Sequence, residues 1–346
     1  MKTIVIGLLF PLLGGVACCQ KVPEKSYEYR VLVVDDGGEP VGNANVWTMR
    51  YSWIEDSQIP AAKPIKVNTL TADKGVASIA FLSAQTPGGV AVSKDGYYGS
   101  TAPANWIFPE GFWDTPTSHH GKTAKTEIEI ILRPVKNAIP MHAYNNAGAM
   151  DQIANVPDLD REYGYDIKMS EPLPPLGKGM VADFTFVVSG THDGNSNYNL
   201  KLDVKFSNPK DGVVEFVTPQ RTAVREPIRT GSALVSDYEA PADGYKRNIT
   251  RSLKRNGIEN PGETDVDFRR NFYFRTRTVT DAAGKIVSAH YGKIYGDFQF
   301  DAARKDWGYL STLALVTTYF NPTPNDRNVE FDTGRNLLPG GNVQQP

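Results

Sequence analysis

The stretch from Tyr29 to Val46, YRVLVVDDGGEPVGNANV, decides the fold class of this 346-residue chain. Residues 30–34 are mostly aliphatic and β-branched, which is the composition of a strand with a buried face. Residues 35–38 (DDGG) favour a turn, because glycine adopts positive φ easily and aspartate accepts hydrogen bonds from its own turn. Pro40 cannot donate to a strand ladder and suits a turn or a strand edge. The stretch therefore predicts strand, turn and strand.

The same plan recurs as far as residue 132. Residues 69–81 (TLTADKGVASIAF) predict two strands around a turn, residues 90–98 (VAVSKDGYY) predict a third strand and turn, and residues 126–132 (TEIEIIL) alternate polar and apolar as a closing strand. This order resembles the carboxypeptidase-regulatory-like family of small β-sandwiches, the transthyretin-like domains, over roughly residues 27–134. The matching motifs are VVD at 33–35, GEPV at 38–41, NANV at 43–46, TADKG at 71–75 and DGY at 95–97. The resemblance implies an accessory, adhesive or spacer module.

The second half of the chain predicts a larger all-β domain over residues 179–338. Leu200, Leu202, Val204 and Phe206 fall on one face of a strand with charged residues opposite, which is half-buried antiparallel patterning. Further strands are expected at 181–188, 212–217, 271–280, 285–300 and 309–320. We therefore expect an all-β chain, with an N-terminal transthyretin-like or immunoglobulin-like sandwich followed by a larger antiparallel sandwich or jelly roll.

Three other segments complete the expected organisation. The proline-rich residues 135–178 are expected to connect the two domains. A helix is expected over residues 243–257, because Asp243 can cap it, Tyr245, Ile249 and Leu253 form a stripe, and Gly257 can end it. Residues 339–346 (PGGNVQQP) are expected to be a disordered tail.

Residues 1–19 have the pattern of a signal peptide. Lys2 supplies a basic start, residues 4–13 are apolar, and small residues precede Cys18 and Cys19. The ending resembles a bacterial lipobox with Cys18 as the lipidated residue, although Gly15 stands where that motif prefers leucine. Ordinary signal-peptidase cleavage near Ala17 or Cys19 is the alternative. We expect an exported protein held at the outer membrane or cell surface by a lipid anchor only, or alternatively a periplasmic or secreted protein.

Composition excludes several kinds of chemistry. The net charge of −2 gives no basic field for nucleic acid. Both cysteines lie in residues 1–19, so the mature body has no disulfide and no thiolate nucleophile. The chain contains no Gly-x-Ser-x-Gly or His-Glu-x-x-His motif. Residues 193–199 carry too few carboxylates for a calcium loop, and His119 and His120 have no third ligand nearby. No cofactor or metal is expected, and the sequence favours a non-catalytic protein.

Aromatic residues between 97 and 113 are the clearest indication of a ligand site. Exposed rings grip flat sugar faces because a ring offers area with little loss of side-chain entropy. The ligand-binding candidates are Tyr98, Trp106, Phe108 and Trp113, with packing between the domains as the alternative. The sequence favours a cell-surface binding or structural module, with a polysaccharide or a cell-surface protein as its partner. A polysaccharide-acting hydrolase and a pure spacer or assembly subunit stay open.

Overall fold

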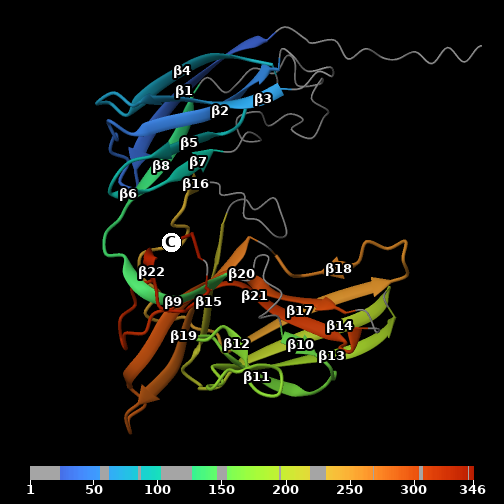
Figure 1. The fold of residues 1–346 in the computed structure, drawn as a ribbon. Coiled ribbons are helices and arrows are strands. Elements are labelled where there is room, and N and C mark those ends of the chain that lie inside the picture. Colours follow the sequence, from blue (N-terminus) through green and yellow to red (C-terminus); the bar gives the residue numbers. More distant parts are fainter. Residues whose placement is uncertain are drawn as a thin grey trace, which may run out of the picture.

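The computed structural model describes residues 24–54, 62–84, 87–102, 127–145, 154–194, 196–218, 231–267, 269–303, 307–341 and 343–346. These residues form two β-sandwiches, drawn one above the other in Figure 1 with the C-terminus between them. No α-helix occurs in the described part of the chain. The prediction of an all-β chain with two sandwiches, the second larger than the first, is confirmed.

The first sandwich contains a four-stranded and a five-stranded sheet around one core. In spatial order the first sheet is β4 (Val76–Ser83), β1 (Lys25–Asp35), β8 (Ile128–Pro134) and β6 (Tyr97–Tyr98). The second is β16 (Gly231–Ser232), β7 (Ser100–Ala102), β5 (Val90–Ser93), β2 (Asn45–Trp53) and β3 (Ala62–Leu70). Alternate residues of β1 enter the core, including Tyr29, Val31 and Val33.

The turn after β1 forms as its sequence predicts. The Asp35 carboxylate accepts hydrogen bonds from the backbone amides of Gly37 and Glu39, both at 2.9 Å. Gly75 closes the turn between β3 and β4 with a φ of +72°. A Cβ atom at Gly75 would overlap the Val33 carbonyl oxygen, so this close approach of two strands requires glycine.

The second sandwich packs a seven-stranded sheet on a six-stranded one. The first follows the order β15 (Gly212–Val217), β19 (Arg270–Thr280), β20 (Ile286–Ala302), β21 (Ser311–Phe320), β9 (Ile139–Asn145) and β22 (Phe331–Asn336), with β10 (Ala154–Val156) also paired to β21. The second follows the order β12 (Glu171–Pro172), β11 (Glu162–Asp166), β13 (Phe184–Gly194), β14 (Asn197–Phe206), β17 (Asn248–Asn256) and β18 (Glu263–Thr264). Phe184, Phe206 and Phe298 pack together in the core between the sheets.

The helix predicted over residues 243–257 is wrong. Most of that segment is strand β17, which pairs antiparallel with β14. Ile249 and Leu253 are four residues apart, and a spacing of four places two side chains on one face of a strand as well as of a helix. Arg251 lies between them in the sequence and points into the sandwich.

Two other segments differ from their expected roles. Residues 135–178, expected to be a connector, contribute β9, β10, β11 and β12 to the sheets of the second sandwich. The tail at 343–346 is packed rather than disordered, with Val343 buried. Tyr295 donates its hydroxyl hydrogen bond to the Pro346 carbonyl oxygen at 3.1 Å, and Tyr319 donates to that of Gln345 at 3.0 Å. The tail sequence has no periodicity of its own, so these long-range partners could not be predicted.

Candidate functional site

Tyr98 lies at the contact between the two sandwiches. Its hydroxyl group donates a 2.8 Å hydrogen bond to Oε1 of Glu330, which belongs to the second sandwich. Burial and then the bond to Glu330 raise the Tyr98 pKa above its ordinary value. The other predicted ligand residues, Trp106, Phe108 and Trp113, lie outside the described residues, as does Cys18.

Glu330 is the centre of this domain junction. Its carboxylate is 1 % exposed and accepts hydrogen bonds from the backbone amides of Lys136 (2.8 Å) and Asn137 (2.6 Å), in addition to Tyr98. These two amides belong to the segment that leads from the first sandwich into the second. A buried carboxylate with three donors is satisfied, and here the second sandwich supplies the acceptor while the first sandwich and the connecting segment supply the donors.

Two further contacts join the sandwiches. The Tyr238 hydroxyl group donates to the Pro134 carbonyl oxygen at 2.8 Å, and the Arg133 guanidinium lies 4.5 Å from the centre of the Tyr238 ring. Strand β16 comes from the second half of the chain, yet it pairs with β7 and extends a sheet of the first sandwich. The pairing of β16 therefore fastens a segment from the second half of the chain to the first sandwich, in addition to the side-chain contacts.

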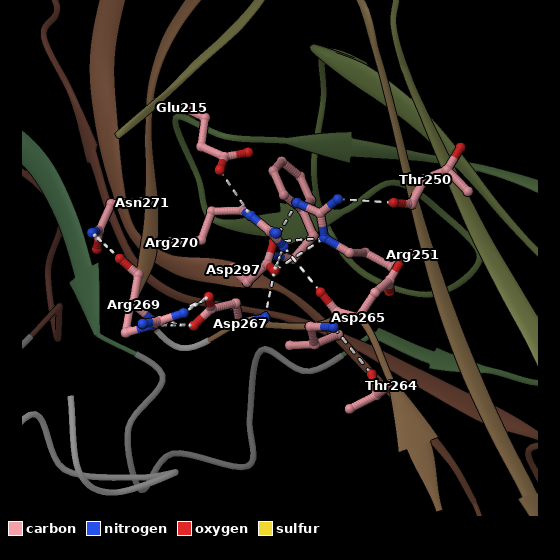
Figure 2. A network of polar contacts seen from close by, with 12 residues as sticks. Glu215, Thr250, Arg251, Thr264, Asp265, Asp267, Arg269, Arg270, Asn271 and Asp297 are labelled. Carbon is pink, nitrogen blue, oxygen red and sulfur yellow. Dashed lines mark hydrogen bonds and ion pairs between the residues drawn. The ribbon is translucent and has the colours of Figure 1, made fainter. Parts of the chain in front are cut away.

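The densest polar network surrounds Asp297 in the second sandwich, as Figure 2 shows. A bulge in β20, between Tyr295 and Phe298, directs this side chain inward, where it is 0 % exposed. Arg251 donates to Asp297 from Nε at 2.9 Å and from Nη2 at 2.8 Å. Arg270 donates at 2.6 Å, and the backbone amide of Asp267 donates at 3.0 Å. Both carboxylate oxygens are thus taken by donors of the chain itself.

A second bulge, in β19, produces a similar arrangement. Arg277 has a φ of +53°, which is uncommon for a residue other than glycine. Its guanidinium donates to the buried carboxylates of Asp183 (2.9 Å) and Asp166 (2.8 Å). Asp211 is also buried, and its pKa is raised chiefly by that burial.

These networks bear on the hydrolase alternative. A glycosidase needs two carboxyl groups about 5–10 Å apart that both face the substrate. Asp166, Asp183 and Asp297 instead face arginines and backbone amides. In the described ranges, no group of three or more His, Cys, Asp or Glu side chains is placed to hold a metal ion.

A row of large side chains lies on the outer face of the first sandwich. Val46 and Thr48 of β2 are fully buried and face the core, so the alternate positions face away from it. We call these positions the β2 row, and they are half-buried: Asn45, Trp47, Met49, Tyr51 and Trp53. Lys66 of β3 pairs with Met49, and its Nζ lies 4.5 Å from the centre of the Trp47 ring. That contact places the three side chains on the same face.

A polar hollow adjoins the β2 row. It has a volume of about 400 Å³ and is lined by Asn43, Asn45, Ser93, Lys94 and Asp95. Asn45 is the first residue of the row and pairs with Ser93 of β5, so the hollow lies at the end of the row next to Trp47. Sequence analysis missed both features. The signal was the period-two pattern of NVWTMRYSW at 45–53, which places every large apolar side chain on one face.

Comparison with known proteins gives no assignment. No family model matches the chain, and no curated protein matches it. The crystal structure of 3-chlorocatechol 1,2-dioxygenase from Rhodococcus opacus 1CP is similar at 12% sequence identity and a TM-score of 0.23. The likeness covers 34% of this chain and 62% of the dioxygenase, which is less than two thirds of its length. At that TM-score it bears on neither fold nor activity. Within the described residues, no helix is long and apolar enough to span a membrane.

Proposed function

We propose that the protein is a non-catalytic, exported binding module, anchored to a membrane surface by lipid at Cys18, whose ligand is carbohydrate. The observation that carries the proposal is the β2 row. Large apolar side chains on a strand normally face the core, and here they face away from it. An outward row of rings is the arrangement expected of a ligand surface.

The domain junction supports the same function. Glu330 and the pairing of β7 with β16 hold the first sandwich on the second. A module joined in this way presents its outer face in one orientation, which suits a binding protein at a cell surface. The resemblance of residues 27–134 to the carboxypeptidase-regulatory-like family is part of the proposal, since such domains are accessory or adhesive modules.

Two alternatives have less support. A polysaccharide-acting hydrolase needs an acid and a base open to substrate, and Asp183 and Asp297 are committed to arginines. A pure spacer or assembly subunit accounts for the junction but gives no reason for an outward row of rings. Trp106, Phe108 and Trp113, which lie outside the described residues, stay proposed ligand contacts from the sequence alone.

A polysaccharide panel tests the proposal. The purified protein is melted with each polysaccharide, and the same samples are assayed for new reducing ends. A ligand at a hundred times its Kd stabilises a protein by about 2.7 kcal/mol, which is a readily measured shift. We expect a shift with at least one polysaccharide and no release of sugar. Released sugar would establish the hydrolase, and the absence of any shift would favour the spacer.

The anchor has its own test. Cells that express the protein are labelled with a fatty-acid probe, together with the variants Cys18→Ala and Cys19→Ala. We expect label on the parent protein and on Cys19→Ala, and none on Cys18→Ala. Equal label on all three proteins, or none on the parent, contradicts a lipid at Cys18.

A further inference from the structure

We infer that the β2 row and the adjoining hollow form one site for an extended, neutral glycan chain. One end of the chain occupies the hollow, and the following sugar rings stack on Trp47 and Tyr51. This inference rests on the proposed function and deepens it, because it states where the ligand binds and what shape it has.

The spacing of the row requires an extended ligand. Residues two apart on a strand are separated by about 6.6–6.8 Å, so Trp47 and Tyr51 lie about 13 Å apart along β2. The row from Asn45 to Trp53 spans about 27 Å by the same rise per residue. A single sugar covers only a small part of that length, whereas a chain of several sugars can contact successive rings. Trp and Tyr offer it large rigid faces at little cost in side-chain entropy.

The large rings on this face are confined to the width of one strand, β2, by the residues on either side of it. On the β5 side, Trp47 faces Ala91 and Asn45 faces Ser93, which are small side chains. On the β3 side, the positions opposite the row carry, from Asn45 to Trp53, Leu70, Asn68, Lys66, Pro64 and Ala62. The rings therefore lie between small side chains of β5 and a mixed face of β3, on which Lys66 and Asn68 are the polar residues.

The narrow width of the β2 row favours a glycan over a protein as the ligand. A stable protein interface buries about 800 Å² on each side around an apolar centre. Here Asn68 and Lys66 are exposed polar residues directly beside Trp47 and Met49, so they interrupt the apolar surface in the middle of the row, where such a centre would lie. A sugar chain has an apolar ring face and hydroxyl groups at its edges. A sugar ring can take the place of the Lys66 ammonium over the Trp47 ring, while the sugar hydroxyls reach Asn68 and the displaced Lys66.

The chemistry of the hollow suits sugar hydroxyls. Two amide side chains, a hydroxyl, an ammonium and a carboxylate line it, and this set supplies both donors and acceptors. Within the hollow Lys94 and Asp95 balance in charge, and the Lys94 ammonium already donates to the Gly42 carbonyl oxygen at 2.8 Å, which suits an uncharged end of the ligand there. The volume of about 400 Å³ falls within the range of small-molecule sites.

Three variants of the full chain test the site. Trp47→Ala removes a stacking ring, and Ser93→Arg fills the hollow from an exposed position at the end of β5. Trp307→Ala is the matched control, because Trp307 is 55 % exposed and belongs to the second sandwich. The probes are neutral hexaoses of the cello, xylo, laminari, chito and malto series, with the corresponding disaccharides. Affinities are measured by calorimetry, and circular dichroism monitors the fold of each variant.

We expect one hexaose to bind the parent protein more tightly than its disaccharide. Trp47→Ala should weaken that binding by about thirtyfold, the loss typical of an aromatic hot spot. Ser93→Arg should also weaken it by more than tenfold, and Trp307→Ala should leave it unchanged. If Trp47→Ala does not fold, Ser93→Arg decides.

Two outcomes overturn the inference. If a hexaose binds and both site variants keep the parent affinity, the ligand lies elsewhere and the proposed function stands. If no hexaose binds, the extended-chain site is wrong, and the polysaccharide panel decides separately whether the protein binds carbohydrate at all.

Discussion

Replacing Asp297 with asparagine should strongly destabilise the second sandwich. The asparagine has the same shape, but it carries no charge and its amide nitrogen cannot accept a hydrogen bond. The Arg251 side chain is only 10% exposed and faces this carboxylate, so the substitution leaves its charge buried and uncompensated. Arg270 and the backbone amide of Asp267 donate to Oδ2, and Arg251 Nη2 donates to Oδ1, so at least one donor loses its acceptor whichever position the amide nitrogen takes.

The size of the effect follows from this burial. Removing one partner of a buried ion pair costs about 3–5 kcal/mol. For a domain of 150–250 residues, each kcal/mol lowers the melting temperature by about 2–4 °C, so we expect a fall of about 6–20 °C. Burial works against the charged guanidinium of Arg270, yet Asp297 and Glu215 hold its pKa above the ordinary value, which agrees with a strong pair.

Scanning calorimetry of the parent and variant proteins measures the effect. Asp158→Asn is the matched control, because the Asp158–Arg161 pair has a similar 3.0 Å distance but is more than half exposed. That change should cost less than about 1 kcal/mol. The double variant Arg251→Met with Asp297→Leu should recover only part of the loss, since it removes the buried Arg251 charge but leaves Arg270 and the Asp267 amide without their acceptor. Equal melting temperatures for Asp297→Asn and Asp158→Asn would contradict the prediction.

Three further predictions concern other parts of the molecule. Glu330→Ala leaves three donors at the junction without an acceptor. Calorimetry should then show two melting transitions where the parent protein shows one. A single transition in the variant would contradict the role of Glu330 in joining the sandwiches. Burial lowers the pKa of His142 and His290 below 6.5, so an unfolded chain takes up protons first and the melting temperature should fall as pH drops below 6.5. Replacing both histidines with glutamine should flatten that dependence, and an unchanged slope would place its cause elsewhere. A Cβ atom at Gly292 would overlap the Tyr319 carbonyl oxygen, so Gly292→Ala should cost at least about 1–3 kcal/mol in denaturant unfolding, and parent-like stability would contradict this packing.

Local signals in the sequence predicted the first sandwich well. The turn at 35–38 depends on Asp35 and its neighbouring glycines, all within a few residues, and it forms as expected. The parallel pairing of β1 with β8 joins residues nearly a hundred positions apart, and no local pattern specifies it. The same holds for β16, which crosses from the second half of the chain to the first sandwich.

The candidate site was harder to predict because its pattern argues for the opposite orientation. In β2 the large apolar residues alternate with Val46, Thr48, Arg50 and Ser52, and burial rules assign the larger set to the core. The structure buries Val46 and Thr48 instead and turns Trp47 outward. Which face of β2 meets the other sheet depends on distant strands. A local pattern that conflicts with the fold is a feature expected of functional surfaces.

A crystal structure with a bound hexaose would show directly whether β2 carries the ligand. We expect an intact sugar chain along β2, with one end among Asn45, Ser93 and Lys94 and its rings on Trp47 and Tyr51. A chain bound away from β2, or one cleaved beside a pair of carboxylates, would contradict it.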